Sequence, residues 1–269
     1  MEIIEDLRQM RSFSSSSRDK GLRVVLVPTM GYLHDGHREL LRTGRRSGDI
    51  LILSIFVNPA QFGPKEDLNS YPMDMERDLS AARDCGVDIV FTPKQEDIYP
   101  AGYGTYAEVE GLSGRLCGAS RPGHFRGVAT VVLKLFNITL PHAAVFGRKD
   151  FQQLLIIRKM AGDLNLGVEI IGVDTVREPD GLAMSSRNSY LSAEERKAAR
   201  CVPASLEEAE KEFEKGVRDT SAIMEKVKKI IEKEPLAVID YIRICDNATL
   251  EDIDRIEGGA HLFLAVRIG

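Results

Sequence analysis

Short apolar runs alternate with segments of helical periodicity along the first half of the chain, and this alternation constrains the fold more than any other feature. Strand-like runs occupy residues 23–27, 50–57 and 87–91, and helix-like segments at residues 36–47 and 74–85 separate them. Runs that are apolar on both faces are typical of parallel strands buried between layers of helices. The pattern therefore predicts an α/β fold with a Rossmann-like, doubly wound parallel sheet.

The alternation continues toward residue 173. Residues 125–138 are apolar on most faces and too long for a typical strand, which favours a buried helix. A strand at residues 143–146, a helix at 150–161 and a strand at 168–173 extend the predicted sheet.

Near Glu178 the character of the chain changes. Residues 192–234 carry many charges of both signs in a helical pattern, and strand-like runs follow at 236–245 and 261–268. We therefore expect two domains, a larger one over residues 1–177 and a smaller α+β domain over residues 178–269.

Two further local patterns complete the secondary-structure prediction. Residues 2–13 are typical of a short amphipathic helix, and the Ser-rich segment Ser14–Ser17 is typical of a turn. Ser192 and Glu195 have the spacing of a capping box at a helix start.

Composition excludes several classes of protein. The net charge of −5 over 269 residues argues against the broad basic surface that duplex nucleic acid requires. The four cysteines are widely spaced, which is typical of reduced thiols. No apolar run approaches the roughly 20 residues that span a bilayer, and the charged N-terminus lacks a signal-peptide pattern. We expect a soluble cytoplasmic protein with no nucleic-acid or membrane partner.

The motif His34-Asp-Gly-His37 follows the first predicted strand and opens a helix. Ligands of open α/β sheets bind beyond the carboxyl ends of the strands, and a helix N-terminus offers free N–H groups to a phosphate. Two imidazoles at this point could donate hydrogen bonds to charge on a transferring phosphate. Two alternatives are a zinc site, which lacks the H-E-x-x-H spacing and a third ligand nearby, and a purely structural pair of histidines.

The second polar cluster, Gly147 to Gln153, follows a predicted strand. Lys149 could place a point charge on a phosphate, and Asp150 could accept hydrogen bonds from ribose hydroxyls. Asp150 is equally compatible with the N-cap of the following helix.

A third cluster, Met184-Ser185-Ser186-Arg187, lies in a loop after Asp180-Gly181. Two hydroxyls and a guanidinium in sequence suit a phosphate clamp, and an ordinary polar linker is the alternative.

Two more segments suit a small polar substrate. Gln61 follows the second strand, and Arg121 and His124 precede the buried helix. For Gln61 and Arg121, plain surface polarity is an equal alternative.

The segments that carry these residues, taken together and in order, resemble the pantothenate synthetase (pantoate–β-alanine ligase) family, within the H-x-G-H nucleotidyltransferase superfamily. They are PTMGYLHDGH, SIFVNPAQF, RPGHFRGV, VFGRKDFQQL and DGLAMSSRNSYLS, between residues 28 and 192. The resemblance implies an ATP-dependent, AMP-forming ligase of the coenzyme A pathway that joins pantoate to β-alanine through a pantoyl adenylate. It also implies Mg²⁺ and a homodimer.

The resemblance also implies a role for each matching position. The residues expected to bind ATP are Met30, His34, His37, Gly147, Lys149, Asp150, Val176, Met184, Ser185, Ser186 and Arg187. Those expected to act in catalysis are His34, His37, Lys149, Ser185, Ser186 and Arg187. Pro28, Gln61, Gln153, Arg121 and His124 are expected on the pantoate and β-alanine side, and Asp78 near the metal.

Three other readings remain open at this point. A nucleotidyltransferase that acts on a phosphate-bearing acceptor would share the histidine motif. A small tRNA-charging relative would need an anticodon-binding region, for which the chain is short. A nucleotide sensor would bind ATP without turnover.

Overall fold

The computed structural model describes residues 1–64 and 66–269, and these residues divide into two compact units. The first unit holds residues 1–113 and 121–176, and the second holds residues 114–120 and 177–269. Residues 114–120, which the sequence analysis placed in the larger domain, group with the second unit through contacts such as the ion pair from Arg115 to Glu251 at 2.8 Å.

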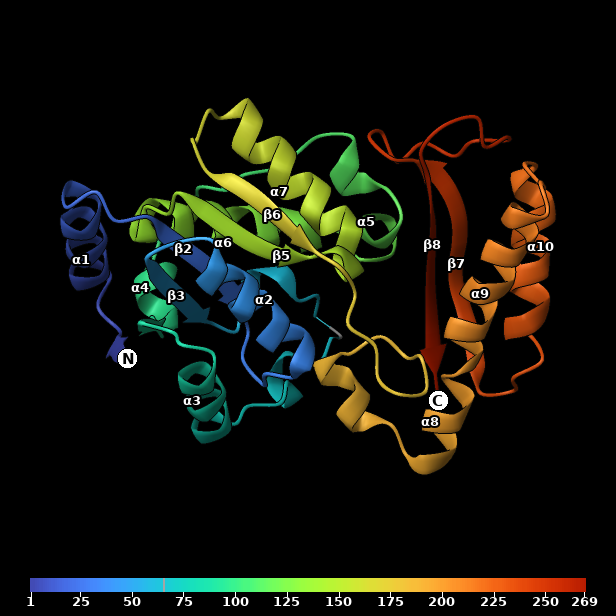
Figure 1. Cartoon of the computed structure of the whole chain (residues 1–269), viewed down its shortest axis with the longest axis horizontal. Coiled ribbons are helices and arrows are strands. Elements are labelled where there is room, and N and C mark those ends of the chain that lie inside the picture. The colour runs from blue at the N-terminus through green and yellow to red at the C-terminus, as the bar shows by residue number, and fades with distance from the viewer. Residues whose placement is uncertain (65) are drawn as a thin grey trace. The chain divides into compact units, whose positions relative to one another are not determined.

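A six-stranded parallel sheet forms the centre of the first unit, in the order β1-β4-β3-β2-β5-β6 (Figure 1). This confirms the predicted fold class. The strands are β1 (Glu2–Ile4), β2 (Val24–Thr29), β3 (Ile50–Ile55), β4 (Ile89–Phe91), β5 (Ala143–Gly147) and β6 (Glu169–Val173).

The helices of the first unit pack on and around this sheet. They are α1 (Leu7–Asp19), α2 (Asp35–Arg46), α3 (Met75–Asp84), α4 (Gln95–Ile98), α6 (His124–Thr139) and α7 (Phe151–Asp163). Helix α6 packs beside α1 and α7, whereas α2 packs beside α3. Alternate residues of β2 and β3, including Val25, Val27, Leu51 and Leu53, are fully buried in the core that α2 and α3 share. Burial on both faces explains why these strands read as continuous apolar runs.

The N-terminal prediction is wrong in two respects. Residues Glu2–Ile4 form an edge strand paired with β4, and α1 begins only at Leu7, where the Asp6 carboxylate accepts the Gln9 N–H at 2.7 Å. The Ser14–Ser17 segment is helical and not a turn. Its Ser17 hydroxyl donates to the Phe13 carbonyl at 2.9 Å, so serine becomes tolerable on the buried side of a helix.

The second unit joins a two-stranded antiparallel sheet to charged helices. It contains α5 (Cys117–Ser120), α8 (Ala193–Ala198), α9 (Cys201–Glu214), α10 (Thr220–Ile231), β7 (Ala237–Asp246) and β8 (Ala260–Ile268). The predicted capping box is confirmed, because Ser192 N–H donates to Glu195 Oε2 at 2.7 Å and Glu195 N–H donates to Ser192 Oγ at 3.3 Å. Ile223, Val227 and Ile231 of α10 pack against Ile242 and Ile244 of β7.

The parallel sheet brings separate polar segments to one edge, the edge formed by the carboxyl ends of its strands. Thr29 is in register with Ile55, and Gly147 is in register with Val173, so β2, β3, β5 and β6 all end on the same side. Every polar segment that the sequence analysis selected in this unit follows one of these strand ends or opens α6. This edge is the place where ligands bind in open α/β sheets.

Candidate active site

The histidine motif forms the N-terminus of α2. His34 occupies the N-cap position with extended backbone, and its N–H donates to Nδ1 of His37 at 3.3 Å. The two rings lie 4.0 Å apart between centroids and are inclined by 31°. A ring nitrogen that accepts this N–H carries no proton, so neutral His37 holds its proton on Nε2. His37 is therefore a donor at a helix N-terminus, the arrangement that suits an anion.

His37 stays neutral at physiological pH. Burial lowers the pKa of His37 to about 3, with further lowering by the neighbouring charges of His34 and Lys149. A neutral imidazole donates one hydrogen bond without the desolvation cost of a partly buried cation.

Lys149 and Asp150 follow β5 in the short 3-10 helix Arg148–Asp150. Lys149 Nζ lies 3.4 Å from Asp150 Oδ1, and the ammonium holds the pKa of Asp150 below its usual range. Asp150 takes the N-cap position of α7, but its side chain makes no capping hydrogen bond. The capping alternative for Asp150 thus describes its position and not its side chain, which faces Lys149. The charges of Lys149 and Asp150 both act on His37, which places the segment after β5 and the first turn of α2 in one electrostatic site.

Gln61 is held at the end of β3 by Asn58. The Asn58 side-chain amide donates to Gln61 Oε1 at 2.9 Å and to the Gly127 carbonyl at 3.1 Å. Gln61 Nε2 in turn lies 3.2 Å from Met30 Sδ, so predicted ATP-side and pantoate-side residues are in contact. Asn58 received no role from the sequence, although an Asn before a proline at a strand end is a capping signal. Asn58 is the N-cap of the 3-10 helix Pro59–Gln61.

Arg121 and His124 meet Gln61 at the start of α6. Arg121 Nη1 lies 3.3 Å from His124 Nε2, and His124 Nδ1 lies 2.8 Å from the Gln61 carbonyl oxygen. Arginine only donates, so His124 accepts on Nε2 and donates from Nδ1. Burial, in the first place, lowers the pKa of His124.

Glu66 is a second residue that the sequence analysis missed. Its carboxylate pairs with the Arg121 guanidinium, with Nε to Oε1 at 2.8 Å, and this bond holds the pKa of Glu66 low. The two residues are 55 positions apart along the chain, so no local pattern could reveal the pair.

The remaining predicted residues of this unit lie at the same edge of the sheet. Pro28 is the penultimate residue of β2, Gly147 ends β5, and Gln153 is in the first turn of α7. Val176 lies beyond the end of β6. Their ligand contacts stay predictions.

Asp78, which the resemblance places near the metal, is buried beside the loop that precedes α2. Its side chain is only 2% exposed, and its two carboxylate oxygens accept the N–H groups of Tyr32 and Leu33 at 2.7 and 2.6 Å. Among residues 1–64 and 66–269, no three His, Cys, Asp or Glu side chains form a group that could hold a metal ion. The described residues therefore contain no metal site built from three or more such side chains, and they give no support to the zinc alternative for the histidine pair.

The predicted phosphate clamp belongs to the second unit, considered by itself. Ser185 caps the 3-10 helix Ser186–Tyr190, and its Oγ accepts the Arg187 N–H at 3.3 Å. Ser186 is buried, Met184 is half-buried and Arg187 is exposed.

Arg196 organises the segment on either side of this clamp. Its guanidinium donates to Glu178 at 2.7 and 2.9 Å and to Asp180 at 2.8 and 3.0 Å. Glu178 Oε1 also accepts the Asn188 amide at 2.7 Å, so one guanidinium ties both ends of the Met184–Arg187 segment. Arg196 received no role from the sequence, because it is one of many charged residues in a predicted helix.

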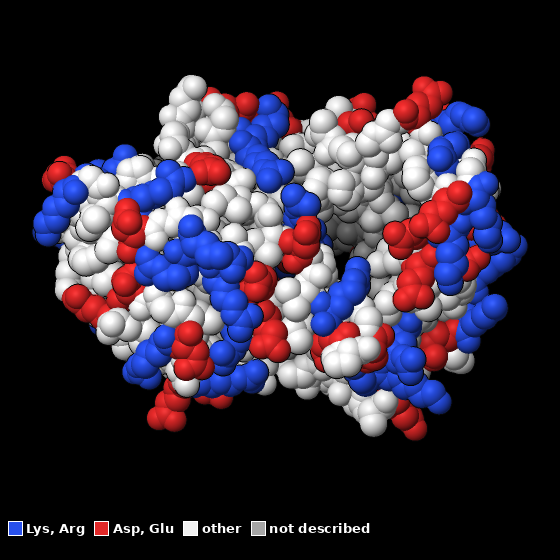
Figure 2. Space-filling model, viewed as in Figure 1, with Lys and Arg blue, Asp and Glu red and all other residues white. Residues whose placement is uncertain are grey.

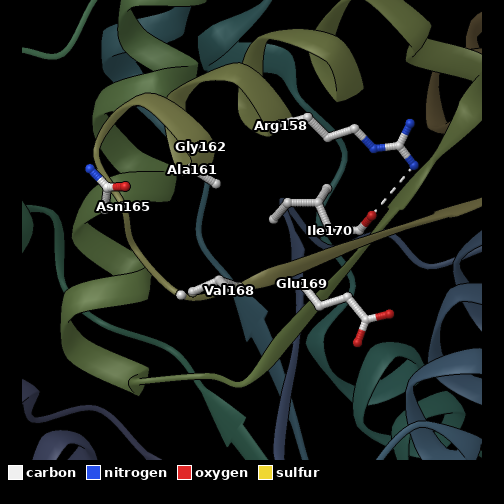
Figure 3. A pocket seen from close by; sticks show the side chains of 8 residues that line it. Arg158, Ala161, Gly162, Asn165, Val168, Glu169 and Ile170 are labelled. Carbon is white, nitrogen blue, oxygen red and sulfur yellow. Dashed lines mark hydrogen bonds between the residues drawn. The ribbon is translucent and has the colours of Figure 1, made fainter.

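A shallow depression of about 600 Å³ lies on the side of the sheet formed by the amino ends of the strands. Figure 3 shows Arg158 of α7 directed toward the Ile170 carbonyl and Glu169 directed away from it. The depression lies at the amino end of β6, so it is separate from the strand-end site.

On the face in view in Figure 2, Lys and Arg side chains alternate with Asp and Glu, as expected for a solvated surface. In the part of the chain that the structure describes, every helix is too short or too polar to cross a bilayer.

Comparison with known proteins identifies relatives over the whole chain. The family model described as pantoate-beta-alanine ligase matches residues 2–269. A pantothenate synthetase of Syntrophotalea carbinolica is 56% identical over 100% of this chain and 95% of its own length. That of Geobacter sulfurreducens is 52% identical with the same coverage.

Solved structures agree with these relatives. The pantothenate synthetase of Thermus thermophilus superimposes with a TM-score of 0.93 at 41% identity, over 100% of this chain and 95% of that one. A pantoate-beta-alanine ligase of Francisella tularensis, complexed with beta-gamma ATP and beta-alanine, gives a TM-score of 0.83 at 34% identity, over 100% and 94%. The chain belongs to the pantoate–β-alanine ligase family.

Proposed function

We propose that this ligase joins pantoate to β-alanine at the expense of ATP, through a pantoyl adenylate, and releases AMP and pyrophosphate. The observation that carries the proposal is the neutral His37 Nε2–H at the N-terminus of α2, in one electrostatic site with Lys149. The complex of the Francisella tularensis relative with beta-gamma ATP and beta-alanine supports the same substrates.

In the first step a carboxylate oxygen of pantoate attacks the α-phosphorus of ATP. The new O–P bond forms as the bond between the α-phosphorus and the bridging oxygen breaks, and pyrophosphate leaves with the electron pair. A carboxylate with a pKa of about 4 is already ionised at pH 7, so no general base is needed. The step requires alignment and stabilisation of charge on the phosphates. His37 and Lys149 donate to that charge, and Gln61, fixed by Asn58, holds the pantoate.

In the second step the amine of β-alanine attacks the acyl carbon. The C–N bond forms, the acyl C–O bond breaks, AMP leaves with that oxygen, and the proton lost by the amine passes to water. The involvement of Ser185, Ser186 and Arg187 stays a prediction from the sequence, as do Mg²⁺, the homodimer and the cytoplasmic location.

Product analysis under two conditions tests the proposal. With ATP and pantoate alone, we expect about one pyrophosphate per site and no free AMP; addition of β-alanine should release AMP and pantothenate in equal amounts. Pyrophosphate release that needs a phosphate-bearing acceptor, or ATP binding without any turnover, would contradict it. These outcomes correspond to the nucleotidyltransferase and sensor alternatives.

A further inference from the structure

The loop between β2 and the histidine motif has an unusual backbone. Gly31 and Tyr32 are both left-handed, with φ of 85° and 51°. Glycine adopts this region readily, but a residue with a Cβ such as Tyr32 stays there only when its surroundings hold it. The loop leads directly into His34. The contacts that hold Tyr32 therefore also determine the position of the backbone that carries His34 and His37.

Asp78 of α3 is the group that holds this loop. One carboxylate oxygen accepts the Tyr32 N–H at 2.7 Å and the other accepts the Leu33 N–H at 2.6 Å. Both distances are short, as expected of charge-assisted hydrogen bonds. Arg77, the preceding residue, lies over the Tyr32 ring at 5.1 Å from its centroid.

Close approach of Asp78 depends on Gly31. A Cβ at residue 31 would lie 2.9 Å from Asp78 Oδ2 and 3.1 Å from Ile55 Cγ2. A glycine at residue 31 is therefore what allows the buried Asp78 carboxylate to reach the N–H groups of this loop.

We propose that Asp78 is a positioning residue for His37, and not a ligand of the metal. It fixes the N–H groups of residues 32 and 33, and the next residue, His34, donates its own N–H to His37 Nδ1 at 3.3 Å. Asp78 thereby sets the tautomer of His37 and the direction of its Nε2–H. The link to catalysis rests on the function proposed above, whereas the link to the ring tautomer does not.

Asp78→Asn tests the proposal, because an amide nitrogen must then face one of the two N–H donors. The matched control is Asp88→Asn: Asp88 also accepts a backbone N–H, from Leu51 at 2.8 Å, but at the amino edge of the sheet. The ring nitrogens of the histidines are recorded by long-range ¹⁵N–¹H NMR of the full-length protein, together with the rate of pantoate-dependent pyrophosphate release.

In the wild type and in Asp88→Asn we expect His37 with its proton on Nε2 and His124 with its proton on Nδ1. In Asp78→Asn we expect mixed tautomers at His37 only, and a rate lower by up to about 100-fold, the size of loss that a small misplacement of a reacting group causes. If the Asn variant fails to fold, Asp78→Ser is measured in its place, because the smaller serine hydroxyl can accept only one of the two N–H groups. The expected tautomers and rate are the same.

Unchanged His37 signals in the folded variant would overturn the proposal. So would a lost rate that high Mg²⁺ restores, because that result identifies Asp78 as a metal ligand. A wild type with the expected tautomers but no adenylation would contradict the proposed function and leave the positioning role intact.

Discussion

The backbone N–H of His34 donates to Nδ1 of His37 across 3.3 Å, so the first turn of α2 determines which nitrogen of His37 can face a ligand. With burial holding the pKa of His37 at about 3, the ring presents a neutral Nε2–H at pH 7. A fixed donor of this kind stabilises developing charge without reorganisation during the reaction.

Replacement of His37 by alanine should lower the rate of pyrophosphate release by about 100-fold or more, since removal of one preorganised donor has an effect of this size. His142→Ala is the matched control, because His142 Nδ1 also accepts a backbone N–H, from Val24 at 3.0 Å, at the other end of β2. Single-turnover measurements should find the loss only in the first variant. Equal losses in both would indicate a structural effect common to the two histidines.

Removal of the Lys149 charge should have two separable effects. Lys149→Met should slow adenylation by roughly 100-fold, as expected for loss of a preorganised charge. It should also raise the pKa of His37, because the Lys149 ammonium is one of the charges that lower it. Lys159, paired with Asp163 at 2.9 Å near the end of α7, provides the control substitution. An NMR titration that shows no upward movement of the His37 pKa would contradict the shared site.

The depressed pKa of His37 predicts how stability depends on pH. The unfolded chain binds a proton on this residue near its ordinary pKa of 6.5, whereas the folded chain does so only near 3. Between these values the unfolded state binds more protons, so the contribution of His37 to stability is present above 6.5 and is lost as the pH falls toward 3. Urea midpoints measured across this range should fall less steeply for His37→Gln than for the wild type. Parallel curves for the two proteins would show that His37 is not held neutral.

Replacement by alanine of two glycines on neighbouring helices should change the free energy of unfolding in opposite directions. A Cβ at Gly127 of α6 would lie 2.1 Å from the Ala60 carbonyl oxygen, next to Gln61, whereas nothing lies within 4 Å of a Cβ at Gly162 of α7. Gly127→Ala should destabilise the protein by about 1–3 kcal/mol or more, and Gly162→Ala should stabilise it by about 0.5–1 kcal/mol. Gly127→Ala should also raise the KM for pantoate. Equal unfolding midpoints would contradict the close approach of α6 to the Gln61 segment.

In the second unit, Arg196→Lys should weaken the segment that carries Ser185 and Arg187. A lysine cannot reproduce the forked contacts to Glu178 and Asp180. We expect faster proteolysis near Met184 and a higher KM for ATP. The control is Lys228→Ala, which should change neither quantity much, because Lys228 forms only an exposed ion pair with Glu232 at 3.7 Å. Unaltered cleavage in the first variant would show that the hub does not order the segment.

The sequence predicted the sheet well where strands are buried on both faces, as in β2 and β3, because their apolar runs have no other explanation. It failed at Glu2–Ile4, a three-residue edge strand with one buried side chain, and at Ser14–Ser17, which is helical and where the Ser17 hydroxyl donates to the Phe13 carbonyl of the preceding turn.

Site residues were predictable when they follow a strand end, as His34, Gln61 and Lys149 do. Long-range partners were not: Glu66, 55 positions from Arg121, received no role, and Asp78, 46 positions from Tyr32, was expected near the metal instead. Sequence pattern identifies residues suited to bind a ligand, but only the fold reveals which distant side chains fix their orientation.

Transfer of oxygen from pantoate to AMP tests the central claim most directly. The enzyme is given pantoate with both carboxylate oxygens labelled with ¹⁸O, together with ATP and β-alanine, and the products are analysed by mass spectrometry. If the carboxylate attacks the α-phosphorus, AMP carries one ¹⁸O atom and pantothenate retains the other. Label in inorganic phosphate with formation of ADP, or AMP without label, would contradict a pantoyl adenylate.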